Sequence, residues 1–180
     1  PLGEHLEARF GLANNNETAV IEVAEASGLH CVPAEARDAL RATSRGTGDL
    51  ILAALKHRPK TLIMGLGGSA TTDGGAGMLQ ALGARLLDNQ GEEIGPGGAG
   101  LARLATADLE PAIRRLNGIQ LIVACDVTNA LLGPEGAAAV FGPQKGANED
   151  DVRQLDANLA HFSQVVKAQD LDIASFPGSG

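Results

Sequence analysis

Thr61-Leu62-Ile63-Met64-Gly65-Leu66 runs directly into Gly67-Gly68-Ser69-Ala70-Thr71-Thr72-Asp73-Gly74-Gly75. The first six residues are mostly apolar and too few for a helix, so they predict a buried strand, and the small and polar residues after them predict a loop. Beyond the loop, apolar residues recur on one helical stripe at Met78, Leu79, Leu82 and Leu86. We expect Thr71 or Thr72 to cap this helix, because a hydroxyl accepts from the free N–H groups at a helix start. A strand, a glycine-rich loop and a helix in this order are typical of an α/β fold.

The remaining sequence adds strands and helices on both sides of this unit. Leu6 to Gly11 and Thr18 to Ala24 flank a polar turn and predict a β-hairpin. Gln120 to Cys125 predicts a second buried strand, and Ala84 to Leu87 predicts the start of another hairpin. Helices are expected at 34–40, from Thr47 or Gly48 onward, and at 149–168, and a loop is expected at 95–100. The predicted fold class is α/β, with a mixed sheet, antiparallel hairpins and flanking helices.

Composition excludes several classes of function. The 180 residues carry a net charge of −8 and contain no Trp or Tyr, which disfavours nucleic-acid binding. No apolar run approaches the ~18 residues that span a bilayer, so no membrane association is expected, and without a recognisable leader a cytoplasmic location is expected. Cys31 and Cys125 lie in apolar surroundings and are expected to be reduced and buried, and the four scattered His residues do not predict a zinc site.

The glycine-rich loop is a candidate anion site. Glycines at 65, 67, 68, 74 and 75 allow a phosphate to approach the backbone closely, and a strand–loop–helix unit directs N–H groups toward one point. A tight turn without a ligand is the alternative. Gly65 to Ala70 also fits G-x-G-x-x-A, a dinucleotide pattern that is weak by itself. Asp73 at the helix start and Asp88 in a turn argue against a dinucleotide.

Four charged residues accompany this loop as candidates for chemistry. Asp73, and Asp126 at the end of the second buried strand, could hold Mg²⁺ or accept a hydroxyl proton. Arg45 and Lys145, each beside glycines, could contact phosphate. The alternatives are capping or turn roles for the two aspartates and solvated side chains for the two cations.

Four segments together resemble the bacterial glycerate kinase family (type 1). They are Ser44-Arg45-Gly46-Thr47-Gly48-Asp49-Leu50, Gly67 to Gly75, Ala124-Cys125-Asp126-Val127-Thr128-Asn129 and Phe141-Gly142-Pro143-Gln144-Lys145-Gly146. The resemblance implies ATP-dependent phosphorylation of D-glycerate, with 2-phosphoglycerate favoured as the product. It also implies that residues 1–180 form the second domain of a two-domain kinase, inserted into a Rossmann-like first domain whose N- and C-terminal parts, with their motifs, are absent here. The first domain would then be a partner within the same chain, and a homodimer is a further expectation.

The resemblance also implies roles for individual residues. Phosphate or the glycerate carboxylate would be bound by Arg45, Gly67, Gly68, Ser69, Thr71, Thr72 and Asn129. Asp126 or Asp73 would orient Mg²⁺ or the substrate hydroxyl, with Asp126 as the metal ligand, and Lys145 would neutralise developing charge. Two other functions stay open, a dinucleotide-binding oxidoreductase fragment and a non-catalytic interaction domain.

Overall fold

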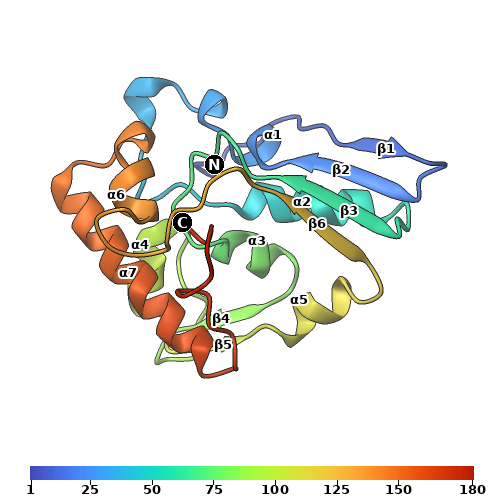
Figure 1. The fold of residues 1–180 in the computed structure, drawn as a ribbon. Helices are drawn as coiled ribbons and strands as arrows, with labels where there is room; N and C mark the ends of the chain where they lie inside the picture. The colour runs from blue at the N-terminus through green and yellow to red at the C-terminus, as the bar shows by residue number, and fades with distance from the viewer.

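The computed structural model describes residues 1–180 and contains two β-sheets with flanking helices (Figure 1). The strands are β1 (Gly11–Ala13), β2 (Thr18–Glu22), β3 (Thr61–Gly65), β4 (Arg85–Leu87), β5 (Thr106–Asp108) and β6 (Gln120–Ala124). The α-helices are α1 (Val23–Ser27), α2 (Arg45–Leu55), α3 (Ala76–Ala81), α4 (Gly97–Gly100), α5 (Glu110–Arg115), α6 (Ala137–Phe141) and α7 (Glu149–Lys167), and short 3₁₀ turns cover 29–31, 34–36, 101–103 and 143–145. None of these helices combines the length and the apolar character that a membrane-spanning helix needs.

The larger sheet has the strand order β1-β2-β3-β6. β1 pairs antiparallel with β2, and β2, β3 and β6 are parallel, so the predicted α/β class with a mixed sheet is confirmed. The predicted hairpin at the N-terminal end is also confirmed, although its first strand is shorter and later than expected, at 11–13. A separate two-stranded antiparallel sheet joins β4 and β5.

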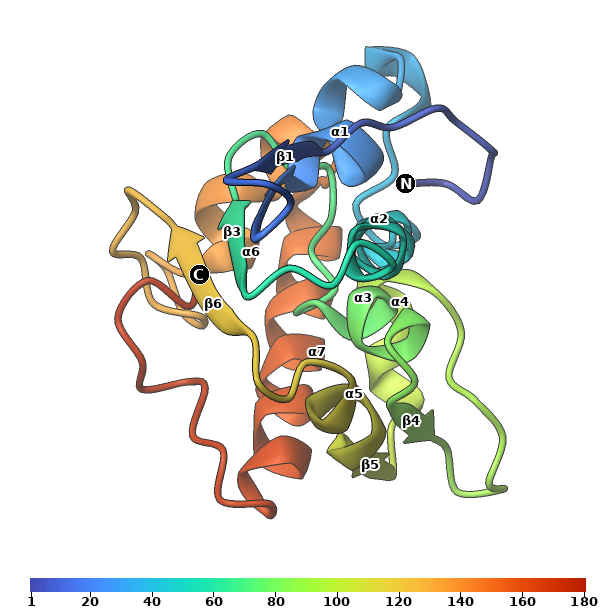
Figure 2. The same cartoon turned by 90° about the vertical axis from the view of Figure 1, so that its right-hand side faces the viewer.

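The buried side of the larger sheet packs against helices, and one contiguous cluster of 25 buried apolar residues fills the space between them. Figure 2 shows α2 and α3 stacked on one side of the strands. These two helices approach so closely that a Cβ on Gly48 would lie 2.6 Å from the Cβ of Ala81. The long helix α7 begins with a reciprocal capping box between Asn148 and Asp151, and it buries an apolar stripe that includes Leu155, Leu159 and Phe162.

Five local predictions were wrong. The helix after the glycine-rich loop has Gly75 at its N-cap, with φ of 77°, and neither Thr71 nor Thr72 caps it. Residues 97–100 form the short helix α4 within the predicted loop, and the predicted helix at 34–40 is only a 3₁₀ turn at 34–36. The expected buried strand at 120–125 is exposed along its whole length, because β6 is the last strand of the sheet and nothing covers it. Cys125, which follows it, is exposed as well.

Candidate active site

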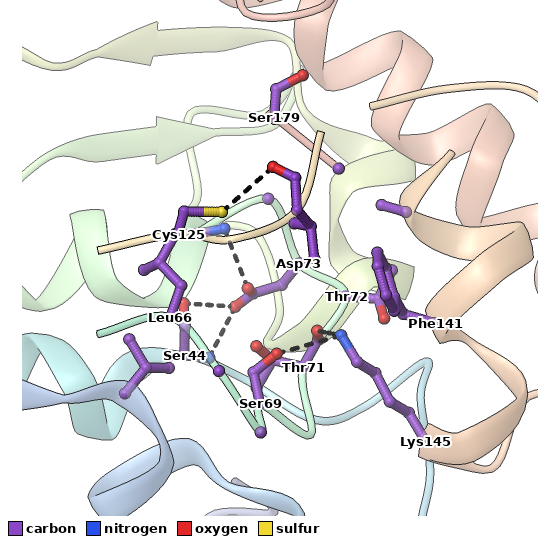
Figure 3. Close-up of a pocket in the computed structure, with 18 of the residues that line it drawn as sticks. Ser44, Leu66, Ser69, Thr71, Thr72, Asp73, Cys125, Phe141, Lys145 and Ser179 are labelled. Carbon is purple, nitrogen blue, oxygen red and sulfur yellow. Dashed lines mark hydrogen bonds between the residues drawn. The ribbon is translucent and has the colours of Figure 1, made fainter. Parts of the chain in front are cut away.

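A cavity of about 430 Å³ lies at the carboxyl ends of β3 and β6. Each of the four sequence motifs contributes to its wall: Ser44 and Thr47, the loop from Gly67 to Gly75, the Cys125–Val127 segment, and Gln144 with Lys145. Figure 3 shows Ser44, Lys145 and the adjacent loop residues Thr72 and Asp73 converging on this space from three separate segments. Parallel strands bring their carboxyl ends to one edge of a sheet, which is where ligands bind in open α/β folds.

Asp73 organises the loop side of the cavity. Its side chain is 1 % exposed, and its Oδ2 atom accepts from the Ser44 backbone N–H at 2.8 Å, from the Ser44 hydroxyl at 2.8 Å and from the Gly77 N–H at 3.2 Å. Its Oδ1 atom accepts from the Gly75 N–H at 3.1 Å. Ser44 Oγ in turn accepts from the Met78 N–H at 2.9 Å. The carboxylate therefore joins the start of α2 to the start of α3 and has little free hydrogen-bonding capacity.

Lys145 crosses the cavity from the opposite side. Its Nζ atom donates to the carbonyl oxygen of Thr71 at 2.5 Å and to Ser69 Oγ at 3.2 Å. The side chain is 8 % exposed, and this burial lowers the pKa of Lys145 to about 8, with the charge of Asp73 acting in the opposite direction. The ammonium group thus holds the loop in place and supplies the positive charge that faces the cavity.

The segment between Asp73 and β3 offers free polar groups to a ligand. Gly67 is exposed, and a Cβ there would meet nothing within 4 Å, so the backbone borders open space. Gly68 has φ of +72°, a conformation that favours glycine. Thr72 is 5 % exposed, lines the cavity, and its buried hydroxyl has no hydrogen-bond partner. A buried hydroxyl without a partner costs free energy, which a bound ligand would recover.

The structure separates two predicted residues from the other eight. Eight of the predicted residues line the cavity, namely Asp73, Asp126, Lys145, Gly67, Gly68, Ser69, Thr71 and Thr72. Of these, Asp126 is exposed at the end of β6. Arg45 has an exposed side chain on the first turn of α2 and is not part of the wall. Asn129 is also outside the wall, and its side chain donates to the Glu135 carbonyl oxygen at 2.8 Å. The chain contains no cluster of three or more acidic, His or Cys side chains that could hold a metal ion.

Some wall residues were not predicted from the sequence. Ser44 and Thr47 lie in the motif at 44–50, in which the sequence points only to Arg45 as a functional residue. Ser179 and Gly180 reach the cavity because the Gly180 N–H donates to the Asn129 carbonyl oxygen at 3.0 Å, and the hydroxyl of Ser179 is buried without a partner. Their signal was the small-residue run Pro177-Gly178-Ser179-Gly180, which is of the same kind as the loop at 67–75.

The dinucleotide pattern does not have the geometry it requires. That fingerprint needs a helix to begin within the glycine motif, whereas β3 ends at Gly65 and α3 begins at Ala76. Asp88 follows β4 in the small antiparallel sheet and pairs with Arg103, so it is not at the end of a neighbouring parallel strand.

The model of the glycerate kinase family matches residues 1–180. The chain is 57% identical over 167 residues to a glycerate kinase of Bacillus subtilis (strain 168), covering 93% of this chain and 44% of the relative. It is 52% identical over 181 residues to the glycerate 2-kinase of Escherichia coli (strain K12), covering 100% of this chain and 48% of that relative. A crystal structure of a candidate glycerate kinase 2 from Salmonella typhimurium LT2 superposes with a TM-score of 0.98 at 49% identity, over 100% of this chain and 49% of the other. The chain thus spans about half the length of these relatives, and it belongs to the glycerate kinase family.

Proposed function

We propose that this chain supplies part of the active site for ATP-dependent phosphorylation of D-glycerate, with 2-phosphoglycerate as the favoured product. The observation that carries the proposal is that four segments far apart in the sequence all reach one cavity, which also contains two buried hydroxyls without partners. The relatives named glycerate kinase and glycerate 2-kinase support the reaction and its product. Residues 1–180 would act as one domain of a longer enzyme, together with a first domain in the same chain.

The reaction joins an oxygen of a glycerate hydroxyl to the γ-phosphorus of ATP while the bond from that phosphorus to the ADP oxygen breaks and the hydroxyl proton leaves. Little covalent chemistry is left for the protein in such a transfer, so positioning and charge neutralisation dominate. The N–H groups of Gly67 and Gly68 and the hydroxyl of Thr72 would bind phosphate or carboxylate oxygens. The Lys145 ammonium would neutralise the charge that develops on them.

Asp126 is the carboxylate that we assign to Mg²⁺, since it is exposed at the cavity and its side chain forms no hydrogen bond within the chain. Mg²⁺ is commonly held by one or two carboxylates together with substrate phosphates and water, so a site without a protein cluster fits this ion. When bound, the ion would neutralise phosphate charge beside the reacting oxygen. Asp73 would position the loop, because its two oxygens already accept four hydrogen bonds.

Two assignments extend beyond the cavity wall. Arg45 is adjacent to Ser44 and would reach phosphate only by turning its exposed side chain toward the site. Asn129 would support the segment after Asp126. Arg45→Ala and Asn129→Ala test these roles. A fall in kcat/KM of less than twofold for either variant would remove that residue from the site.

The test uses calorimetry and an active chimaera. The 180-residue chain is titrated with D-glycerate and with Mg-ATP, separately and together, and NADH serves as the control ligand. In the chimaera, this chain replaces the matching region of the B. subtilis glycerate kinase. We expect Asp126→Asn and Lys145→Met each to lower kcat/KM at least about 100-fold, with an exposed control, Glu4→Gln, unchanged. Phosphorus NMR identifies the product.

An inactive chimaera that is folded would overturn the proposal, as would unchanged turnover in the Asp126 and Lys145 variants. Heat from NADH would favour the oxidoreductase alternative. If the 180-residue chain is folded but binds none of these ligands, and the chimaera is also inactive, a non-catalytic interaction domain would be favoured. A product with phosphate on the terminal oxygen would remove only the preference for 2-phosphoglycerate.

A further inference from the structure

Strand β6 has the sequence of an interior strand and the exposure of an edge strand. All five of its residues, Gln120 to Ala124, are exposed. The exposed fractions of its three large apolar side chains are 47 % for Leu121, 42 % for Ile122 and 46 % for Val123. Consecutive apolar residues place apolar side chains on both faces of a strand, a pattern typical of parallel strands that are covered on both sides. Long apolar edges are normally avoided because they pair with other chains.

The pairing register shows which surfaces of β6 are incomplete. Leu121 and Val123 are opposite Leu62 and Met64 of β3, which are buried on the core side of the sheet at 0 % and 6 % exposure. Leu121 and Val123 therefore face the core side, yet the helical layer stops before it reaches them. On the other side of the sheet, Ile122 continues a row formed by Val20 and Ile63, which are both only partly buried.

The backbone of β6 has one free side. The Gln120 N–H donates to the Lys60 carbonyl oxygen at 2.8 Å, and the Ala124 carbonyl oxygen accepts from the Leu66 N–H at 3.3 Å. Backbone groups of alternate residues point to opposite sides of a strand. The amides of Leu121 and Val123 therefore point away from β3, where the sheet ends.

We propose that β6 is an interior strand of the complete protein. A further strand of the same polypeptide pairs with its free side, and this polypeptide also covers the row formed by Val20, Ile63 and Ile122. The occupant is assigned to the additional chain because the relatives are about twice as long as the 180 residues described here. β6 leads directly into Cys125 and Asp126 of the cavity, so one end of the added strand would lie beside the active site. This inference rests on the proposed function only in assuming a longer kinase.

Amide hydrogen exchange tests the pairing without any need for turnover. In the 180-residue chain, the Leu121 and Val123 amides should exchange quickly, whereas the Ile122 amide, which points toward β3, should be protected. In the chimaera, the protection of Leu121 and Val123 should increase at least about 100-fold, to the level of Ile122. Unchanged fast exchange at Leu121 and Val123 in a folded chimaera would overturn the inference, whether or not the chimaera phosphorylates glycerate.

A proline substitution provides a second test. Val123→Pro removes only an N–H group that faces away from β3, and proline is tolerated at such edge positions. It should shift the melting temperature of the 180-residue chain by less than about 2 °C but lower that of the chimaera by more than about 5 °C. Val123→Thr, which keeps the N–H group and the β-branch, is the matched control. Equal shifts in both proteins would contradict the proposal.

A second copy of the chain is the competing occupant. Sedimentation of the 180-residue chain and of the chimaera distinguishes the two. We expect any self-association of the short chain to disappear in the chimaera and in Val123→Pro of the short chain. A different result would assign β6 to a homodimer interface instead. In that case the chimaera dimerises, and the Val123→Pro substitution abolishes both the dimer and the slow exchange of the Leu121 amide.

Discussion

The carboxylate of Asp73 accepts two hydrogen bonds from Ser44, one from its backbone N–H and one from its hydroxyl, both at 2.8 Å. The two residues are 29 positions apart in the sequence, and their contact joins the first turn of α2 to the loop before α3. The cavity wall on this side is therefore held by one buried anion surrounded by N–H and O–H donors. Such a group stabilises the fold only while all of its donors are present.

Asp73→Asn should destabilise the chain. The amide group would present a donor to an N–H or O–H that now donates to the carboxylate, which leaves a buried polar group unpaired. We expect the free energy of unfolding to fall by about 2–4 kcal/mol, measured by urea denaturation. Ser44→Ala should cost about 1–2 kcal/mol, and the double variant should cost less than the sum.

Glu4→Gln serves as the control for Asp73→Asn, because Glu4 is exposed and its side chain forms no hydrogen bond or ion pair. Its effect should stay within about 0.5 kcal/mol. Strict additivity of the Asp73 and Ser44 substitutions would show that the hydrogen bonds between them do not contribute to stability.

Lys145 should make the stability of the chain depend on pH in the alkaline range. Burial lowers its pKa from 10.5 to about 8 in the folded chain. Between these values the unfolded chain binds more protons than the folded chain, so stability should rise as the pH increases from about 8 to about 10.5. Urea denaturation at several pH values in this window measures the slope. Lys145→Met should remove most of it, and the exposed Lys56→Met should leave it unchanged.

Alanine should affect the stability of the fold at Gly68 but not at Gly67, although both residues lie in the glycine-rich loop. Gly67 borders open space, so Gly67→Ala should leave the melting temperature of the chimaera unchanged or raise it slightly. The added methyl group would project where a phosphate should lie, and kcat/KM should fall at least about tenfold. Gly68 has φ of +72°, so Gly68→Ala should cost about 1 kcal/mol of stability before any effect on turnover.

Thermal melting and steady-state kinetics on the two glycine variants decide between these effects. A Gly67→Ala enzyme with normal kcat/KM would show that the ligand does not approach the backbone at this residue. Equal melting temperatures for the two variants would contradict the strain expected at Gly68.

The sequence predicted the parts of this molecule that depend on local chemistry. The apolar run at 61–66 predicted a strand, which forms at 61–65, and the amphipathic stripe at 149–168 predicted the helix that forms at 149–167. Segments governed by tertiary contacts were predicted less well. Residues 97–100 become helical despite three glycines, because they fit closely between neighbouring segments, where a Cβ on Gly98 would lie 2.3 Å from Leu155. An apolar pattern at 120–124 cannot reveal whether another strand is present to cover it.

For the candidate site, the motifs predicted which loops meet but not how each side chain is used. Eight of the ten predicted residues reach the cavity, since residues at the ends of parallel strands and in the loops beside them gather at one edge of the sheet. The direction of the Arg45 side chain and the inward fold of Ser179 depend on contacts between distant segments, which no local pattern encodes.

Thr72 and Ser179 provide a test in which stability and binding should change in opposite directions. Both hydroxyls are buried beside the cavity without a partner. Thr72→Val keeps the shape of the side chain and removes the unpaired group, so the free energy of unfolding of the ligand-free chain should rise by up to about 1 kcal/mol. In the chimaera, the KM for D-glycerate or for Mg-ATP should rise about 3- to 10-fold, since the lost hydrogen bond is worth about 1 kcal/mol. Ser179→Ala should have the same two effects.

Thr106→Val is the matched control, because Thr106 lies on β5 with an exposed side chain away from the cavity. It should alter neither KM. The substrate whose KM responds to Thr72→Val identifies which ligand this hydroxyl contacts. If Thr72→Val lowers stability and leaves both KM values unchanged, the hydroxyl makes an internal hydrogen bond, and the ligand lies elsewhere in the cavity.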